Sequence, residues 1–405
     1  MTTLFDAHRP KAWVAQEPST ELFEETSDKT TGTVQTRKLA SQHDVVHDKM
    51  YWTHINQTNA TSTPGAAESV EQVFKIAPND VEGEIVTIKL KQVITASASS
   101  VMFPQNMITG VYYNLPGGVQ TPAVDGLLVA TESIMNVNTE DLTVNAGALG
   151  FGADFVGTTC NTESTVLIDV TGPVRAMKLW PKFLNQPIEL RFKYRPIASF
   201  MDTATQTISS ITSTMIIQSR LTDAEEQKII AKAYHDGFQA TALVPYPAIT
   251  ATVAGTTELN LDMDLTGNCA FLVAMIADVS GDVQENALDF SGLTKYRIID
   301  AAGNSIFFRN GSQYVSVNEH WARDAEMFDG VGLFKKNILI LNTGCNNIVD
   351  TLQDGTYRGG YNFEGNERLQ ITSSDSSADY LYLFPFKYEV FLIKNGQFVR
   401  REDLK

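Results

Sequence analysis

Apolar and polar side chains alternate along much of this chain, and the alternation predicts short β-strands. Between Ile188 and Tyr194 every second residue is large and apolar, and the residues between them are charged. The same two-residue period occurs in residues 84–94, 164–170 and 259–266. Such alternation is typical of antiparallel sheets that pack one face on a core and leave the other in water. The chain is therefore predicted to be an all-β protein.

Other segments complete the pattern in both halves of the chain. Residues 269–278 (CAFLVAMIAD) are apolar without alternation, which predicts a strand buried on both faces. Ala302-Gly303-Asn304 and Asn395-Gly396 are typical hairpin turns between strand-like runs. Each half thus carries about six to nine short strands, the signature of a sandwich or barrel. No alternation of helices with strands favours a parallel α/β fold.

One segment, residues 221–237, has the period and the end signals of a helix instead. Thr222 is predicted to be its N-cap, with Glu225 completing a capping box. Gly237 is placed to take the left-handed position that ends the helix. The apolar stripe expected to pack on the protein consists of Ile229, Ile230 and Ala233. Because strand patterns lie on both sides, the helix is interpreted as a connector between two similar β domains; the alternative is a surface helix within one β domain.

The pattern predicts four parts of the chain. Residues 1–70 are rich in Thr, Ser, Asp and Glu, interrupted by prolines and without sustained periodicity, which indicates an amino-terminal arm or long loops. Residues 71–221 are predicted to form the first β domain. Residues 222–242 form the connecting helix and linker, and residues 243–405 form the second β domain.

Composition narrows the classes of function. With 47 acidic and 31 basic residues among 405, the formal net charge is −16, which argues against a protein coated in nucleic acid and against sequence-specific nucleic-acid binding. The three cysteines, Cys160, Cys269 and Cys345, form no CxxC pair, so we expect buried thiols in a reducing compartment. No apolar signal core or membrane-spanning run is present, so synthesis and folding are expected in the cytoplasm.

Few segments resemble catalytic or metal-binding motifs. His43-Asp44-Val45-Val46-His47 has the histidine spacing of a zinc protease helix, but the shorter Asp replaces the glutamate base, and a polar loop is the preferred interpretation. Asp262 and Asp264 alternate with apolar residues, which places both on the solvated face of a strand rather than in a metal site. His8, His54, His235 and His320 stand alone and are interpreted as structural.

The loops with the most unusual sequences also lack a catalytic pattern. In the glycine-rich residues 147–157, Phe155 occupies the place of the third glycine of a dinucleotide-binding motif. Residues 322–330 and 355–371 have the most unusual sequences, and the second is expected to be a turn with glycine and asparagine before a strand. Four side chains of the second loop would suit a contact between subunits, namely Tyr357, Arg358, Tyr361 and Phe363. No catalytic, cofactor-binding or metal-binding residue is assigned, and no cofactor is expected.

Two short segments resemble the double jelly-roll major capsid proteins of tectivirus-like phages and of large nucleocytoplasmic DNA viruses. The connector motif of that family, L-D-x-(D/E)-E-R followed by H-E-Y, is matched by Leu221, Asp223, Glu225, Glu226, His235 and Asp236, with Gln227 in place of the arginine and Gly237 in place of the tyrosine. The later P-S-G-x-x-N-F-S loop is matched by Gly360, Asn362 and Phe363 only. The resemblance covers about residues 84–394.

The resemblance implies two eight-stranded jelly-roll barrels side by side, with a few short helices. It implies a homotrimer of pseudo-hexagonal outline that contacts neighbouring capsomers and minor capsid, penton or cement proteins in the icosahedral virion of a double-stranded DNA bacteriophage or virus. Many relatives enclose an internal membrane, which the amino-terminal region is then expected to contact. The function implied is that of a structural protein and not an enzyme.

Two other classes of function stay open from the sequence. One is a two-domain β-sandwich spike or carbohydrate-binding protein, which would present an exposed aromatic platform. The other is a glycan-processing enzyme on a β scaffold, which would need two carboxylates converging in a cleft.

Overall fold

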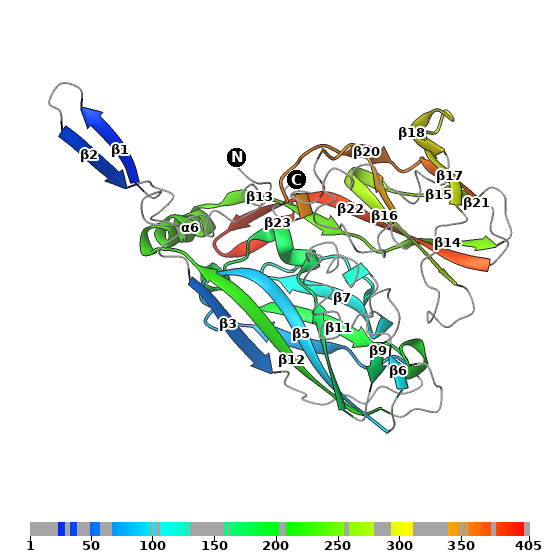
Figure 1. Cartoon of the computed structure of the whole chain (residues 1–405), viewed down its shortest axis with the longest axis horizontal. Coiled ribbons are helices and arrows are strands. Elements are labelled where there is room, and N and C mark those ends of the chain that lie inside the picture. The colour runs from blue at the N-terminus through cyan, green and yellow to red at the C-terminus, as the bar shows by residue number, and fades with distance from the viewer. Residues whose placement is uncertain are drawn as a thin grey trace.

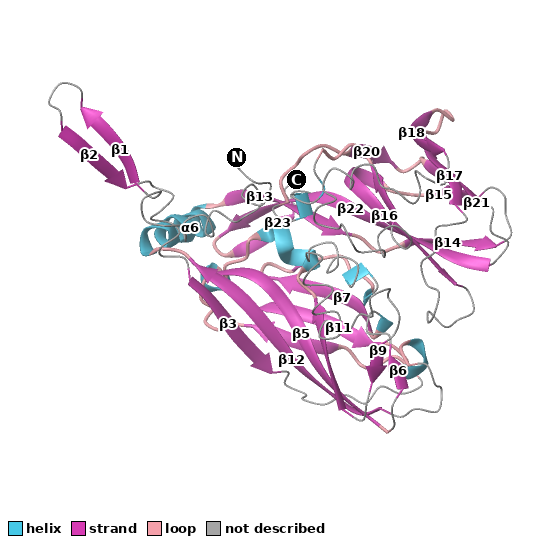
Figure 2. Cartoon of the chain, viewed as in Figure 1, coloured by secondary structure: helices cyan, strands magenta, loops and turns pink. Residues whose placement is uncertain are grey.

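The computed structural model describes residues 23–28, 33–38, 49–56, 67–97, 100–102, 106–126, 128–129, 158–160, 163–201, 208–254, 259–278, 293–310, 339–346, 348, 351–352, 355–373 and 378–400. Strands dominate this part of the chain, and helices are few and short (Figures 1 and 2). Among the described residues, no helix combines the length and the apolar character that a transmembrane helix needs. The predicted all-β class is confirmed.

Two antiparallel four-stranded sheets form the first barrel, whose strands lie between residues 49 and 221. Sheet 1 has the order β10 (Glu163–Asp169), β5 (Glu84–Ala96), β12 (Ile208–Leu221) and β3 (Lys49–Asn56). Sheet 2 has the order β4 (Gln72–Ile76), β11 (Ile188–Tyr194), β7 (Ile108–Leu115) and β8 (Val119–Gln120).

A second pair of sheets is built from residues 238 to 400. Sheet 3 follows the path β13 (Phe238–Pro245), β22 (Ala378–Lys394), β16 (Thr266–Asp278) and β19 (Leu339–Asn342), and three further strands lengthen it: β14 (Ile249–Ala254), β20 (Tyr361–Glu364) and β23 (Gln397–Arg400). Sheet 4 has the order β15 (Leu259–Asp262), β21 (Arg368–Ser373), β17 (Leu293–Ile299) and β18 (Ser305–Asn310).

The seven strands of sheet 3 form four rows. Strands β13 and β14 follow one another along the same edge of the long strand β22, and β19 and β20 do so along β16. On the other edge of β22, β23 continues the row of β16. Numbered along the chain, the rows of sheet 3 have the order 1-8-3-6 and those of sheet 4 the order 2-7-4-5. Sheets 1 and 2 have the same two orders, so the chain contains one topology twice.

Several shorter elements accompany the two barrels. Two strand pairs stand apart from the four sheets: β1 (Phe23–Asp28) with β2 (Thr33–Lys38), and β6 (Ser100–Met102) with β9 (Thr158–Cys160). In Figure 1 the β1–β2 hairpin projects away from the barrels. The helical elements whose bounds lie within the described residues are η3 (Gly172–Met177), η4 (Pro181–Phe183), η5 (Ile197–Ser199) and α6 (Ala224–Asp236).

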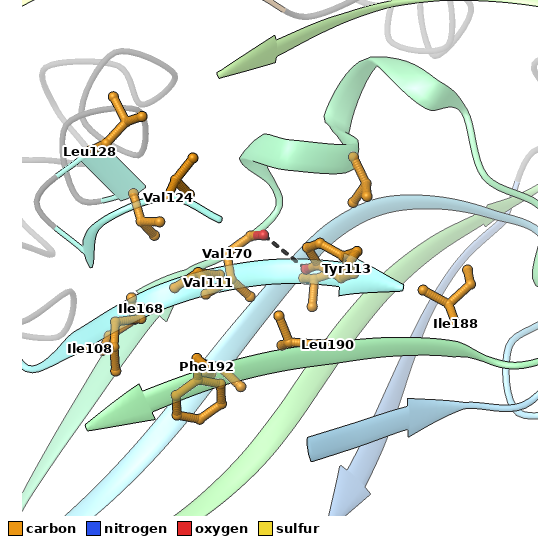
Figure 3. Close-up of a cluster of buried hydrophobic side chains, with 14 of the residues drawn as sticks. Ile108, Val111, Tyr113, Val124, Leu128, Ile168, Val170, Ile188, Leu190 and Phe192 are labelled. Atoms are coloured by element: carbon orange, nitrogen blue, oxygen red, sulfur yellow. Dashed lines mark hydrogen bonds between the residues drawn. The ribbon is translucent and has the colours of Figure 1, made fainter. Parts of the chain in front are cut away.

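The interior of the first barrel follows from the alternation in its strands. Inward residues of sheet 2, such as Tyr113, Leu190 and Phe192, meet inward residues of sheet 1, such as Ile168 (Figure 3). All of them are fully or almost fully buried. The Tyr113 hydroxyl has a partner there, because it donates a hydrogen bond of 2.8 Å to the carbonyl oxygen of Val170. Burial of a tyrosine thus leaves no polar atom of that side chain unsatisfied.

The sequence pattern did not predict every strand. Residues 1–70 were expected to hold an arm or loops, yet β1, β2 and β3 lie there, and β3 pairs with β12 along its whole length. This pairing makes β3 part of sheet 1, before the predicted start of the first β domain at residue 71. The reason is that β3 is an edge strand: Met50 and His54 are exposed, and Ile55 is only partly buried. An edge strand need not alternate, because its position depends on a distant partner.

The predicted helix is confirmed, but its cap and its buried face differ from the prediction. Asp223 is the N-cap, and its carboxylate accepts hydrogen bonds from the backbone N–H groups of Glu225 (2.9 Å) and Glu226 (2.8 Å). The predicted cap, Thr222, is buried, and its hydroxyl has no hydrogen-bond partner among the described residues. A charged carboxylate satisfies two N–H groups at the positive end of the helix, which explains why Asp223 prevails.

The expected apolar stripe of α6 is likewise only partly correct. Ile229 is 70% exposed, and the residue that α6 buries is Tyr234, with 3% exposure. Gly237 follows the helix at φ +108°, so a residue free to take positive φ is needed there, as expected. Both hairpin turns are confirmed: Asn395 and Gly396 have positive φ between β22 and β23, and Gly303 does between β17 and β18.

Replacing Asp223 with Ala is expected to lower the free energy of unfolding by about 1 kcal/mol, because two helix N–H groups lose their acceptor. Thr222→Val keeps the size of the side chain and removes a buried hydroxyl, so this control is expected to leave stability unchanged or raise it. Urea denaturation followed by circular dichroism measures both. A loss with Thr222→Val and none with Asp223→Ala would restore Thr222 as the cap.

Candidate functional site

The residues considered for chemistry do not converge in the described part of the chain. No group of three His, Cys, Asp or Glu side chains there could hold a metal ion. Asp262 and Asp264 are both exposed, as predicted, but only Asp262 lies on the strand: β15 ends there, and Asp264 follows it with φ +43°. Asp262 forms an ion pair of 2.8 Å with Arg368. His54 and His235 are exposed and lie apart. Outside the described residues lie His8, His43, His47, His320 and residues 322–330 and 147–157, Phe155 among them.

Two of the three cysteines are described with their side chains. Cys269 and Cys345 are buried free thiols, as predicted, whereas the side chain of Cys160 lies outside the described part. Burial raises the pKa of the Cys269 thiol to about 12, so it stays protonated at neutral pH. A protonated thiol inside a sheet is a core residue rather than a nucleophile.

What the structure does bring together is the junction between the two barrels. Sheet 3 is buried on both faces there. On β16, Leu272 and Ala274 belong to the core between sheets 3 and 4, while Phe271 and Val273 belong to the core that continues into the first barrel. The prediction of a strand buried on both faces is thus confirmed for residues 269–274, which are all buried.

Aromatic side chains fill the junction. Phe271 on β16 stacks on Phe386 on β22, with ring centroids 4.6 Å apart. Tyr234 of α6 lies between Phe183 of the first barrel and Phe238 of β13, at centroid distances of 5.9 and 5.2 Å. Such pairs add about 0.5–1.5 kcal/mol each beyond the burial of their area. The connecting helix therefore packs on both barrels at once.

The hydroxyl of Tyr234 ties α6 to the first barrel. It accepts a hydrogen bond from the backbone N–H of Trp180 (3.1 Å) and donates one to the carbonyl oxygen of Lys178 (3.2 Å). Desolvation raises the pKa of Tyr234 well above its ordinary value, so the hydroxyl keeps its proton. Both backbone partners lie in the segment that joins η3 to η4.

The turn between β22 and β23 contacts both the connecting helix α6 and the first barrel. The N–H groups of Asn395 and Gly396 donate to the carbonyl oxygens of His235 (3.2 Å) and Tyr234 (3.1 Å) at the end of α6. The carbonyl oxygen of Gly396 accepts from Asn185 (3.2 Å). This short turn therefore contacts the connector and the first barrel through its backbone.

Glycines permit that close approach. A Cβ atom at Gly396 would lie 2.7 Å from the carbonyl oxygen of Phe183, and one at Gly117 would lie 2.3 Å from the carbonyl oxygen of Phe398. Both distances are shorter than real Cβ contacts. The N–H of Phe398 also donates to the carbonyl oxygen of Pro116 (2.8 Å), so backbone meets backbone across the junction.

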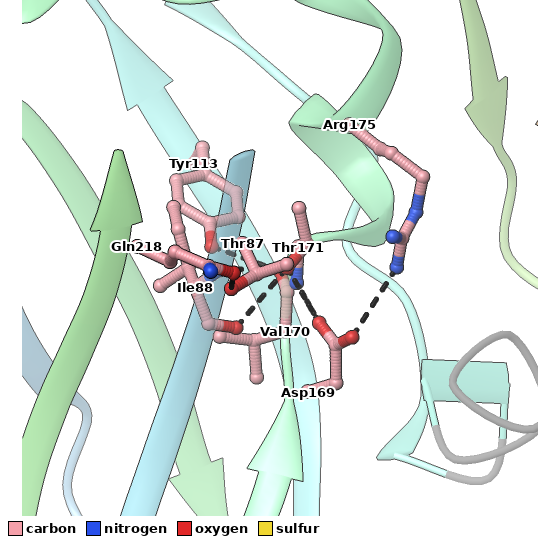
Figure 4. A network of polar contacts seen from close by, with 8 residues as sticks. All are labelled: Thr87, Ile88, Tyr113, Asp169, Val170, Thr171, Arg175 and Gln218. Atoms are coloured by element: carbon pink, nitrogen blue, oxygen red, sulfur yellow. Dashed lines mark hydrogen bonds and ion pairs between the residues drawn. The ribbon is translucent and has the colours of Figure 1, made fainter. Parts of the chain in front are cut away.

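A buried carboxylate positions η3 against the second barrel (Figure 4). One oxygen of Asp169 accepts from the backbone N–H (2.9 Å) and the hydroxyl (2.5 Å) of Thr171, and the other accepts from Arg175 (3.4 Å). The Thr171 hydroxyl in turn accepts from the N–H of Ile88 on β5 (2.7 Å). This network fixes the turn from β10 into η3, which packs against β13.

The later loop that resembled the capsid motif lies beside this junction. A Cβ atom at Gly360 would lie 2.5 Å from the carbonyl oxygen of Cys269, which explains the glycine. Four side chains of this loop were predicted to suit a contact between subunits. For Phe363 the prediction is wrong, because its side chain is only 2% exposed and lies in the core of the second barrel. Tyr357 is 54% exposed and rests edge-on against Tyr388, at a centroid distance of 4.9 Å.

Sequence reasoning missed the junction itself. The sequence predicted the helix, the turn at Asn395-Gly396 and the strand β16 that is apolar on both faces. It did not predict that these three elements lie together at the junction. The one local signal was β16, since a strand without a polar face needs a second layer to cover it.

Comparison with known proteins gives a result only at the level of structure. No model of a known protein family matches the chain, and no curated protein matches it either. Among solved structures, VP54 of PBCV-1, fitted into a reconstruction of the virophage Sputnik, superposes with a TM-score of 0.61 and 12% identity over 92% of this chain and 99% of that one. The fold is the double jelly roll.

Two further structures support the double jelly roll. The Faustovirus major capsid protein superposes with a TM-score of 0.56 and 9% identity over 86% of this chain and 91% of that one. A chain of the PBCV-1 virus capsid gives a TM-score of 0.56 and 12% identity over 92% and 99%. The chain thus spans nearly the full length of these proteins. The predicted architecture of two eight-stranded jelly rolls side by side is confirmed.

Gly396→Ala is expected to destabilise the protein more than Gly303→Ala does. Both residues have positive φ, so each substitution costs about 1–2 kcal/mol in backbone strain. A Cβ atom at Gly303 meets no atom within 4 Å, whereas one at Gly396 overlaps Phe183, which adds about 1–3 kcal/mol. Denaturant titration of both variants tests this difference. Equal losses would mean that the turn does not lock the junction.

Tyr234→Phe is expected to lower the free energy of unfolding by about 1–3 kcal/mol, because the N–H of Trp180 and the carbonyl of Lys178 lose their shared partner. Tyr112→Phe is the matched control: its hydroxyl donates to Glu71 (2.6 Å) on the half-exposed outer face of sheet 2. The control is expected to change stability by less than about 0.5 kcal/mol. Thermal unfolding curves that coincide for the two variants would contradict the role given to Tyr234.

Proposed function

We propose that this chain is a major capsid protein, a structural protein that builds a virion shell and catalyses no reaction. The observation that carries the proposal is that one chain contains the same eight-row topology twice. The two barrels meet at sheet 3, which is buried on both faces at their junction. Proteins named as capsid components share this double jelly roll along nearly their whole length. A rigid pair of similar barrels is a building block for a lattice rather than a scaffold for a cleft.

The proposed assembly is a homotrimer with a pseudo-hexagonal outline. Three chains around a threefold axis place six similar barrels in a ring, so that one protein tiles a nearly flat hexagonal lattice. Edge strands such as β3, which would be a hazard in a free monomer, are then covered by neighbours. The net charge of −16 suits a shell protein that stays soluble at high concentration.

Further parts of the proposal follow from the capsid role. In the virion, the trimers contact neighbouring capsomers and minor capsid, penton or cement proteins, after synthesis in the host cytoplasm. The first barrel begins at β3, the connector is α6 with its flanking residues, and the second barrel begins at β13. The amino-terminal region, including the projecting β1–β2 hairpin, is proposed to contact an internal membrane. Flotation of the full chain with anionic vesicles tests the last point, and a chain that stays at the bottom of the gradient contradicts it.

The capsid proposal is tested by the mass and shape of the purified protein. A particle of three times 44.6 kDa with a hexagonal outline in negative stain is expected, because two barrels per chain close into a six-cornered ring. Analytical ultracentrifugation gives the mass. A stable monomer that binds glycans would refute the assembly and favour the carbohydrate-binding alternative.

A further inference from the structure

The two sheets of the first barrel present outer faces with different charge. On sheet 2, Arg191 forms ion pairs with Glu71 (2.8 Å) and Glu189 (2.7 Å), and Lys75 forms one with Glu189 (3.0 Å). Arg191 holds the pKa of the Glu189 carboxyl below its ordinary value. The outward charges of sheet 2 thus neutralise one another within the chain.

Sheet 1 lacks such pairing at its centre. Lys89 and Lys91 alternate with the buried residues Ile88, Leu90 and Gln92 of β5, and so project from the outer face of the sheet. Neither lysine side chain forms an ion pair or a hydrogen bond within the described residues. Two unpaired ammonium groups therefore lie side by side on a protein whose formal net charge is −16.

The same face carries partly covered aliphatic side chains between the lysines. In register, Lys89 lies between Ile216 of β12 and Asp169 of β10, and Lys91 lies between Thr214 of β12 and Leu167 of β10. Both aliphatic residues, together with Val93, keep part of their surface accessible. A purely phosphate-bearing partner would match the lysines but would leave this apolar surface in water. A protein surface with carboxylates matches both.

A complementary surface exists on the second barrel of the same chain. Asp264 and Glu364 are exposed, and neither carboxylate forms an ion pair within the described residues. They are neighbours, because Glu364 pairs with Thr266, two residues after Asp264, and a Cβ atom at Gly365 would lie 4.0 Å from the Asp264 carboxylate. In Figure 1, β20, which ends at Glu364, lies on the far side of the molecule from β3, β5 and β12.

We propose that the outer face of sheet 1 of one copy, centred on Lys89 and Lys91, docks on the Asp264–Glu364 edge of the second barrel of the next copy. A contact between two different surfaces on opposite sides of a molecule generates a ring when its rotation closes. The first barrel of each copy then meets the second barrel of its neighbour. This inference rests on the proposed trimer and names the surfaces that hold it.

The test begins with charge reversal on the full-length protein. Lys89→Glu with Lys91→Glu is expected to weaken the trimer about tenfold or more, because two attractive pairs become repulsive. Lys228→Glu with Lys232→Glu, on the exposed face of α6, makes the same change in net charge and is expected to leave the trimer intact. Sedimentation equilibrium measures the dissociation constants, and circular dichroism verifies that each variant is folded.

Rescue by a charge swap identifies the partner surface. Adding Asp264→Lys and Glu364→Lys to the Lys89→Glu, Lys91→Glu variant is expected to restore the trimer to within about threefold of the original affinity, because the pairs form again with reversed signs. Asp264→Lys with Glu364→Lys alone is expected to weaken it like the lysine variant.

The outcomes separate the inference from the function on which it rests. A folded Lys89→Glu, Lys91→Glu protein that trimerises like the original, or a weakened one that the swap does not rescue, would overturn the assigned contact and leave the capsid proposal standing. An original protein that is monomeric at all concentrations would refute the proposed trimer itself.

Discussion

The structure depends on one sheet that is buried on both faces where the two barrels meet. Sheet 3 is the wall of the second barrel and also the surface against which the first barrel packs, so residues 269–274 of β16 and 383–386 of β22 are buried on both sides. Apolar interiors pack at crystal-like density, and a contact of this kind cannot slide without opening voids. The two barrels therefore share one continuous apolar core, although each has the topology of a complete domain.

Backbone contacts fix the orientation of the two barrels relative to each other. Aromatic stacking around Phe271 and Tyr234 supplies attraction, but it would tolerate several orientations. The close approach of Gly396 to Phe183 and of Gly117 to Phe398 is far less tolerant, because only backbone atoms fit. The buried carboxylate of Asp169 adds a fixed turn at η3. The relative orientation of the two barrels is thus fixed by close backbone contacts at glycines and by hydrogen bonds. The attraction between the barrels comes from the burial of apolar surface.

The sequence predicted those features that are local. Alternation located β5, β11 and β15, because one face of each contacts a core while the other meets water. The pattern failed at β3, whose place depends on β12 about 160 residues later. Local rules also misplaced the helix cap: Thr222 and Asp223 are both good caps, and the choice depends on the fold, in which Thr222 is buried and the Asp223 carboxylate accepts two helix N–H groups. Phe363 was assigned to the surface because a turn-rich loop gives no sign of the core beneath it.

The junction lies beyond such rules because its parts are distant in the chain. The turn at Asn395-Gly396 was recognisable as a turn, but nothing near it reveals Phe183 or the end of α6. For a folding chain, this arrangement has a consequence in time. The first barrel is synthesised early, yet part of the core it shares is supplied by Phe386, Phe391 and Phe398, close to the carboxyl end. A newly made first barrel therefore keeps an apolar flank uncovered until β22 and β23 have been synthesised, and chaperones that bind apolar surface can act in that interval.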